Sequence, residues 1–197
     1  MKRTGIVALV VVVLLVFALF QWGVSVNNKM VEMDESVSSQ WSQVENVYQR
    51  RADLIPNLVN TVKGYAAHEK QTLTDVVEAR AKATSVNVDP TKLTPEAIQQ
   101  FQQAQGGLSS ALSRLMVVVE KYPDLKANEN FLNLQAQLEG TENRITVERQ
   151  KFNSTAQTYN TYIRKFPQNF IASFKSFEKK AYFEAEKGSE KAPKVQF

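Results

Sequence analysis

The chain begins with a long apolar stretch. Every residue from 6 to 20 is apolar, and no residue from 4 to 26 is charged. As a helix rising about 1.5 Å per residue, residues 4–26 would be roughly 34 Å long, enough to cross a hydrocarbon core of about 30 Å. Trp22 lies near the end of the stretch, where interfacial aromatic residues are common. The pattern predicts a transmembrane anchor over residues 4–26, and a cleaved signal peptide is the alternative.

Four amphipathic patterns follow the apolar stretch. In each, apolar residues recur at steps of three and four, which is the spacing of one face of a helix. The patterns cover residues 33–53, 54–84, 95–122 and 131–166. Short connections between such helices favour antiparallel neighbours. We therefore predict an all-α fold in which an N-terminal transmembrane helix precedes an antiparallel up-and-down bundle of about four long helices.

Local signals mark some of the helix ends. Thr94 and Pro95 form a typical start of a helix, with threonine as the N-cap and proline as the first helical residue. Pro56 is ambiguous: Asp53 could cap a new helix with Pro56 in its first turn, or Pro56 could kink one continuous helix. The longest pattern is interrupted by polar positions that we interpret as layers fixing the helix register. These positions are Thr141, Glu148 and Thr155.

The chain changes character after Pro167. A short aromatic segment with a basic flank follows, and it contains Phe170, Ile171, Phe174 and Phe177. Two roles fit this segment: it closes the end of the bundle, or it rests on a membrane surface or on a partner. The last residues are polar and are expected to be disordered. The predicted organisation is a cytoplasmic tip with the anchor at 1–26, a helical domain at 27–183 and a tail at 184–197.

Basic residues are distributed unevenly around the apolar stretch. Lys2 and Arg3 precede it, whereas Lys29 is the only basic residue between it and Arg50. The positive-inside rule then places the N-terminus in the cytoplasm and the helical domain outside it. The formal net charge of the chain is +4, and no basic block has the density that a nucleic-acid groove needs. We expect a single-pass membrane protein that does not bind nucleic acid.

The sequence contains little of the chemistry that catalysis or metal binding needs. It has no cysteine and one histidine, His68, without a second histidine at the spacing of a helical zinc protease. His68 is therefore expected at the surface or at a helix cap. Gly106 and Gly107 are followed by no phosphate-binding pattern, and we interpret them as a kink or a close helix crossing. We predict no catalytic residue, no cofactor and no metal ion.

Two groups of charged residues are candidate sites. One group lies on the longest pattern and would form interhelical ion pairs or, alternatively, line a polar pocket for a small ligand or an enzymatic reaction; it comprises Glu142, Glu148 and Arg149. The other group is expected on exposed helix faces as contacts for a protein partner, and it comprises Arg50, Arg51, Asp53 and Lys63. Apolar helix faces can also pair with copies of themselves, so self-association is a further alternative.

Three long blocks of the sequence resemble the LemA family. In the order typical of that family they are QWSQVENVYQRRADLIPNLVNTVKGYAAHE (40–69), EKYPDLKANENFLNLQAQLEGTENRI (120–145) and RQKFNSTAQTYNTYIRKFPQNFIA (149–172). The similarity covers residues 31–183 together with the N-terminal anchor. Phe152, which stands where a tyrosine is common in the family, is one departure from the pattern.

The resemblance implies a bacterial single-pass membrane protein whose helical domain is related to the four-helix up-and-down bundle, and such a bundle favours a turn at Pro56. The family has no established enzymatic activity, cofactor or catalytic residue, and one class of members takes part in magnetosome formation. The expected function is therefore that of a non-enzymatic scaffold or partner-binding module. Its expected location is the bacterial cytoplasmic (inner) membrane, and an enzyme or a small-ligand binder is the alternative.

Overall fold

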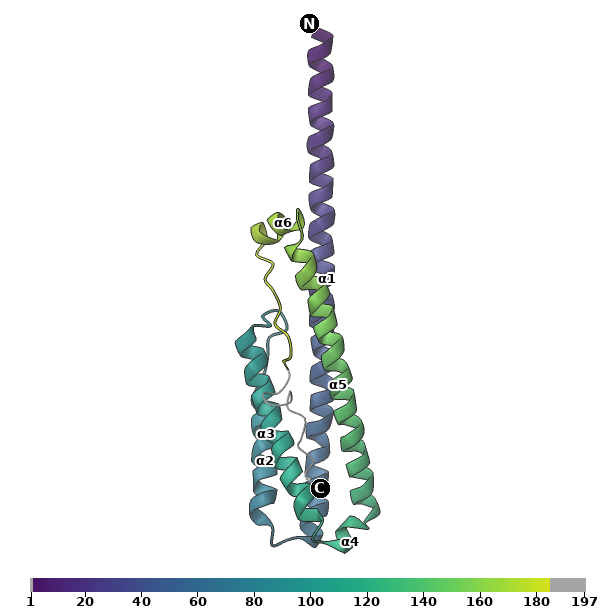
Figure 1. Ribbon diagram of the computed structural model, residues 1–197, viewed down its shortest axis with the longest axis vertical. Coiled ribbons are helices and arrows are strands. Elements are labelled where there is room, and N and C mark those ends of the chain that lie inside the picture. The colour runs from purple at the N-terminus through teal and green to yellow at the C-terminus, as the bar shows by residue number, and fades with distance from the viewer. Residues whose placement is uncertain (1, 185–197) are drawn as a thin grey trace, which may run out of the picture.

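The computed structural model describes residues 2–184, and its longest element is helix α1, Lys2–Tyr65 (Figure 1). The apolar stretch forms the first part of α1 and projects away from the rest of the molecule with its side chains exposed. From Val26 onward, one face of α1 is buried. The predicted anchor and the first amphipathic pattern are thus joined in a single helix of 64 residues.

Helix α1 continues through Pro56, so the turn favoured at this residue is wrong and the alternative of one continuous helix is observed. Pro56 lies on the exposed side of α1. Its missing N–H group removes one helical hydrogen bond, to the carbonyl of Ala52, and that carbonyl has another partner on a neighbouring helix. The turn lies further along, at residues 66–69, where it separates α1 from α2, Lys70–Ser85.

Four long helices alternate in direction along the bundle, as predicted (Figure 1). They are the bundle part of α1, α2, α3 (Pro95–Val119) and α5 (Glu129–Arg164). A single turn, α4 (Pro123–Lys126), lies in the connection between α3 and α5, and α6 (Gln168–Phe174) follows α5. Among residues 2–184, which the structure describes, there are helices and no strands, and this confirms the all-α prediction.

The N-terminus of α3 is capped as predicted. The Thr94 hydroxyl accepts a hydrogen bond of 3.2 Å from the N–H group of Ala97, and Pro95 is the first helical residue. Asn128 caps α5 in the same way, through a hydrogen bond of 3.1 Å from the N–H group of Phe131. These side chains satisfy N–H groups that have no partner inside the helix.

The core consists of two apolar clusters, one above the other along the bundle. The cluster nearer the apolar stretch is aromatic: the ring of Trp41 lies 5.2 Å from that of Phe101 and 5.5 Å from that of Phe152. The other cluster is mostly aliphatic, with Phe131 as a fully buried ring, and includes Ile55, Leu58, Leu108, Leu115 and Leu138. Polar side chains are buried between the two clusters, namely Arg51, Gln105 and Thr141. The predicted polar layer at Thr141 is confirmed.

An extended segment after α6 runs back along the bundle and completes the aromatic cluster. The ring of Phe183 stacks on that of Trp41 at 5.7 Å. Two asparagines of α5 hold the backbone: Asn153 bonds the N–H and carbonyl groups of Phe183, and Asn160 bonds those of Lys180, at 2.8–2.9 Å. Of the predicted tail, residues 184–197, all but Glu184 lie outside the described residues.

Candidate functional site

The polar layer between the two core clusters is built around Arg51. This side chain is only 2% exposed, so the expectation that it lies on an exposed face is wrong. A signal for its burial is present in the sequence. Arg51 lies three residues after Tyr48 and four before Ile55, both of which are buried on α1, and it therefore occupies a core position of the same helical face.

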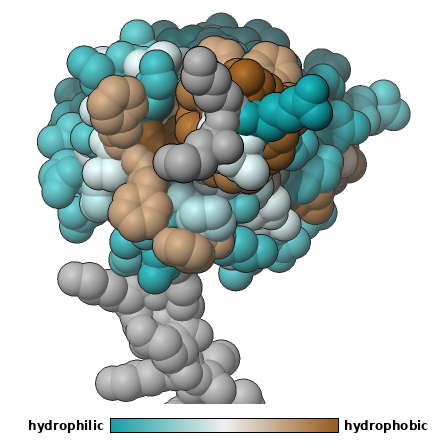
Figure 2. Space-filling view, turned by 90° about the horizontal axis from the view of Figure 1, so that it is seen from above, coloured by the Kyte–Doolittle hydropathy of each residue, from teal (hydrophilic) through white to brown (hydrophobic). Residues whose placement is uncertain are grey.

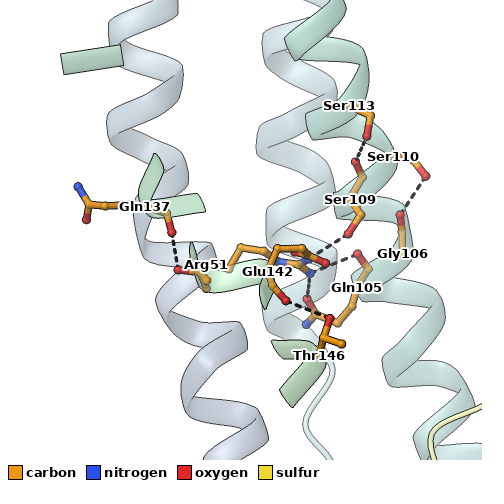
Figure 3. Close-up of polar contacts among 10 residues, drawn as sticks. Arg51, Gln105, Gly106, Ser109, Ser110, Ser113, Gln137, Glu142 and Thr146 are labelled. Atoms are coloured by element: carbon orange, nitrogen blue, oxygen red, sulfur yellow. Dashed lines mark hydrogen bonds and ion pairs between the residues drawn. The ribbon is translucent and has the colours of Figure 1, made fainter. Parts of the chain in front are cut away.

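The guanidinium group of Arg51 joins three helices (Figure 3). Its Nη1 atom donates to the Ser109 hydroxyl and to Glu142 Oε2, both at 2.9 Å. Its Nη2 atom donates to Gln105 Oε1 at 2.7 Å. Gln105 in turn donates to the Ala83 carbonyl of α2 at 3.1 Å. The network therefore connects all four long helices at one level of the bundle.

Tyr48 lies beside this network. The guanidinium carbon of Arg51 is 5.1 Å from the centre of the Tyr48 ring, a cation–π distance. Burial raises the pKa of Tyr48 above its ordinary value, although the positive charges of Arg149 and Arg51 oppose the effect. Tyr48 is therefore a neutral phenol at physiological pH, and it supplies an aromatic face to the arginine.

The predicted pocket of Glu142, Glu148 and Arg149 is only partly formed. Glu142 and Arg149 border one small cavity of about 60 Å³ together with Arg51 and Tyr48. Ligand pockets are usually about 300–1,000 Å³, so this cavity has room for water molecules and not for an organic substrate. Glu148 does not border it: this side chain accepts hydrogen bonds from Gln40 at 2.7 Å and from Lys151 at 2.8 Å.

Of the three residues predicted to form interhelical ion pairs on α5, only Glu142 forms one within the described part of the chain. Glu142 pairs with Arg51 between helices, and Glu148 pairs with Lys151 within α5. The hydrogen bonds from Lys151 and Gln40 hold the pKa of Glu148 below its ordinary value. The third residue, Arg149, lies over the ring of Phe183, with its guanidinium carbon 4.8 Å from the ring centre. Glu142 therefore connects α5 to α1, whereas Glu148 and Lys151 pair within a single helix.

A wider, solvent-open groove of about 480 Å³ lies on the other side of the Arg51–Glu142 pair, along α3 and α5. Its walls are largely apolar and include Leu112, Met116 and Leu138. The sequence did not predict this groove, because it depends on how far α3 and α5 lie apart in the bundle.

The other residues predicted to contact a partner are exposed on α1. Arg50, Asp53 and Lys63 all lie at the surface, and Asp53 accepts a hydrogen bond of 2.7 Å from Gln49. Between Asp53 and Lys63, exposed residues recur at steps of three and four, through Pro56 and Asn60. Asp53 and Lys63 therefore belong to one continuous exposed stripe of α1, which we call the α1 outer stripe.

Histidine and paired glycines occur in many catalytic and phosphate-binding motifs, and the structure shows where His68, Gly106 and Gly107 lie in this chain. His68 is exposed in the turn between α1 and α2, as predicted. At Gly106 and Gly107, an added Cβ atom would meet no atom of another element within 4 Å, so the interpretation as a close helix crossing is wrong. Among residues 2–184, no cluster of three acidic, histidine or cysteine side chains is arranged to hold a metal ion.

The described residues contain one helix that is long and apolar enough to cross a membrane, and it is α1. None of its most apolar window is buried against the rest of the molecule. This exposure distinguishes the stretch from a core helix of a soluble protein, whose apolar residues would be covered by other helices.

Comparison with known proteins gives one consistent assignment. The model of the LemA family matches residues 40–197. The chain is 30% identical over 178 residues to Magnetosome protein MamQ 1 of Paramagnetospirillum magneticum, and 30% identical over 175 residues to Magnetosome protein MamQ of Magnetospirillum gryphiswaldense. It is 24% identical over 158 residues to Protein LemA of Metamycoplasma hominis.

These matches cover most of the chain but less of the relatives. The aligned part is 80% of this chain and 64% of the MamQ 1 protein. For the mycoplasma relative the values are 80% and 68%. The chain thus spans less than two thirds of the length of the magnetosome proteins. Together with the apolar helix, these relatives support association with a membrane.

Proposed function

Because the chain belongs to the LemA family, we propose that it is a non-enzymatic, single-pass membrane protein whose helical bundle binds a protein partner next to the membrane. The observation that carries this proposal is the continuity of α1. One helix runs from the apolar stretch into the bundle with no linker between them. A continuous helix transmits the position of the anchor to the bundle, whereas a flexible linker would let the bundle diffuse around it.

The proposed location is the bacterial cytoplasmic (inner) membrane, with the N-terminus in the cytoplasm and the bundle outside it. Lys2 and Arg3 on one side of the apolar stretch, with few basic residues directly after it, support this orientation. Because the chain has no cysteine, an Ala67→Cys variant carries a single thiol in the exposed turn at the far end of the bundle. A membrane-impermeant maleimide should label this variant equally in intact and permeabilised spheroplasts. Labelling only after permeabilisation would overturn the orientation.

The α1 outer stripe is the proposed contact for the partner. Asp53 and Lys63 of the stripe, together with the exposed Arg50 three residues before Asp53, offer both signs of charge, which favours an electrostatically complementary protein. Arg51 is excluded from this surface because it is buried. The magnetosome proteins among the relatives support a role in organising a membrane rather than in catalysis.

Photo-crosslinking in the membrane tests the partner surface. A photoreactive residue at Asp53 or Lys63 should give a discrete adduct with another protein. The same residue at Thr158, which is exposed on α5, is the matched control. Adducts of the same pattern at all three positions would reject the stripe as a specific contact. Analytical ultracentrifugation of the detergent-solubilised chain shows whether the partner is a second copy.

The alternative function is a small-ligand binder or an enzyme, and the open groove beside Arg51 and Glu142 is the observation that favours it. Glu142 is the group to test, since its side chain is 55% exposed and borders both the groove and the small cavity. If the alternative holds, Glu142→Gln abolishes a cellular phenotype of the gene while the protein keeps its thermal stability. If Glu142→Gln alters the phenotype only to the extent that it lowers the thermal stability of the protein, then Glu142 has a structural role in the bundle.

A further inference from the structure

The short helix α6 packs on α1 at the level where α1 leaves the bundle (Figure 1). The Ile171 side chain reaches the backbone of α1, since a Cβ atom added at Gly23 would lie 3.9 Å from Ile171 Cδ1. Ala172 is buried in the same apolar cluster as Val26 and Met30. One face of α6 therefore closes the end of the bundle, which is one of the two roles expected for this segment.

The opposite face of this segment is apolar and exposed. Phe166 is 78% exposed, Phe170 is 65% exposed and Phe174 is 84% exposed. The rings of Phe166 and Phe170 contact each other at a centroid distance of 5.8 Å. Figure 2 views the molecule from the end at which α1 emerges, and apolar side chains occupy part of this surface among hydrophilic ones. Three neighbouring exposed phenylalanines mark a contact surface rather than a surface in free water.

Basic side chains surround the phenylalanines. Arg164, Lys165 and Lys175 are all exposed, and the Lys175 ammonium group lies 5.9 Å from the centre of the Phe174 ring. Aromatic rings with adjacent lysine and arginine side chains are typical of segments at a membrane surface. There the rings enter the headgroup region and the cations meet lipid phosphates.

The position of the segment along α1 matches the surface of a bilayer. About 20 helical residues, starting from Thr4, span about 30 Å, which is the thickness of a hydrocarbon core. This distance ends near Gly23, whose missing side chain faces Ile171. Trp22, an interfacial type of residue, is partly exposed at the same level. The headgroup region on the bundle side therefore coincides with α6.

We propose that the exposed face of residues 164–175 rests in the headgroup region of the bilayer that α1 spans, and so forms a second membrane contact. The proposal rests on the proposed function in one respect, namely that α1 is transmembrane. A single helix can tilt and rotate in a bilayer. A second contact beside it restrains both motions and holds the α1 outer stripe in one orientation toward a partner.

Spin labels on single cysteines test this contact in the full chain reconstituted into vesicles of phosphatidylcholine and phosphatidylglycerol. The test variants are Phe170→Cys and Phe174→Cys, which change exposed side chains. Leu9→Cys in the apolar stretch is the membrane control, and Ala67→Cys at the far end of the bundle is the aqueous control. The measured quantity is the ratio of collision rates with oxygen, which partitions into lipid, to those with a water-soluble nickel complex.

The labels at 170 and 174 should give a ratio several-fold above that at 67 and below that at 9. A ratio equal to that at 67, with a high ratio at 9, overturns the second contact while leaving the anchor in place. A low ratio at 9 overturns the anchor and the contact together. Protection from the nickel complex with strong spin–spin broadening, removed by dilution with unlabelled chain, would show that a second copy covers the surface and would also overturn the proposal.

Discussion

The Nε atom of Arg80 donates a hydrogen bond of 2.7 Å to the carbonyl of Ala52. This carbonyl is the one that Pro56, four residues later, leaves without its helical partner. Arg80 lies on α2 and Ala52 on α1, so a side chain of the neighbouring helix replaces the missing backbone donor. The replacement explains how α1 passes through a proline without ending, and it ties α2 to α1 at the same point.

This relationship predicts a coupling between Arg80 and Pro56. Arg80→Met should lower the free energy of unfolding by about 1–2 kcal/mol, since it leaves a partly buried carbonyl without a partner. In a Pro56→Ala background the N–H group of residue 56 can bond to Ala52, so the same change should cost less. Chemical denaturation of the four proteins in detergent, followed by circular dichroism, measures the coupling. Equal costs of Arg80→Met in both backgrounds would contradict this account, and Lys82→Met on the same helix is the control.

The Arg51 network predicts an order of stability losses. Gln105→Leu should cost most, about 3–5 kcal/mol, because it leaves a buried cation without its shortest hydrogen bond. Arg51→Met should cost about 1–3 kcal/mol. The substitution removes the buried charge and its desolvation penalty, but it leaves the Gln105 side chain without a hydrogen-bond donor. Glu142→Gln should cost about 1 kcal/mol or less, because Glu142 is largely solvated.

Thermal unfolding of the three variants in the same detergent checks the order. A cost for Glu142→Gln that equals or exceeds that of Gln105→Leu would show that the ion pair, and not the buried amide, holds the arginine. Arg50→Met, which changes an exposed arginine next to the network, is the control and should leave the melting temperature nearly unchanged.

The sequence predicted the parts of the fold that depend on local signals. The apolar stretch, the apolar faces and the Thr94 cap each act within a few residues, and the structure has helices at these places. The residues around Pro56 leave a turn and a continuous helix both open, because the outcome depends on Arg80, which is 28 residues from Ala52 in the chain. No pattern within a few residues of Pro56 indicates that a distant arginine will donate to the Ala52 carbonyl. The sequence around Gly106 and Gly107 leaves a helix crossing open for a similar reason, since spacing does not show whether another helix approaches.

The candidate site was harder to predict than the fold. Arg51 was assigned to the surface from its charge, although its spacing from Tyr48 and Ile55 places it on the core face. The charge of Arg51 favours an exposed position, whereas its place in the helical pattern favours a buried one. The buried position is possible because Gln105, Ser109 and Glu142 supply hydrogen-bond acceptors for the guanidinium group. Those acceptors come from two other helices, so only the packed bundle brings them together. The same holds for the surface of α6, whose level relative to α1 depends on the length of α5.

The two asparagines that hold the extended C-terminal segment predict a graded loss of stability. Asn160→Ala removes the hydrogen bonds to both backbone groups of Lys180 and should cost about 2 kcal/mol. Asn160→Asp keeps an acceptor for the N–H group but places a buried carboxylate against the Lys180 carbonyl, so it should cost at least as much at neutral pH. Phe183→Ala should cost about 3–5 kcal/mol, since it removes a buried ring from the aromatic cluster.

Limited proteolysis separates a local from a global effect of these changes. If the segment can detach alone, Asn160→Ala should accelerate cleavage between residues 177 and 184 while the helices stay protected. Asn143→Ala, an exposed asparagine on the same helix, should leave the cleavage rate unchanged. Cleavage at the same rate in Asn160→Ala and in the unchanged chain would show that the segment stays attached without Asn160.

Glu45 predicts a pH-dependent stability. This carboxyl group is half-buried on α1 beside a cavity of about 330 Å³ that Tyr48 and Gln105 also border. Burial raises its pKa above the ordinary value of 4.5. The folded chain therefore binds this proton more tightly than the unfolded chain, so the contribution of Glu45 to stability is present below pH 4.5 and is lost as the pH rises through the raised pKa.

Glu45→Gln should therefore raise the melting temperature at neutral pH, because it removes a poorly solvated charge and keeps the shape of the side chain. The difference from the unchanged chain should shrink as the pH falls through the raised pKa of Glu45, because the folded-state carboxyl group then takes up its proton and loses its charge. Melting curves across this pH range test the sign, and Glu35→Gln, an exposed acid on the same helix, is the control. A loss of stability at neutral pH would mean that the Glu45 carboxylate is stabilised by its neighbours more than burial destabilises it.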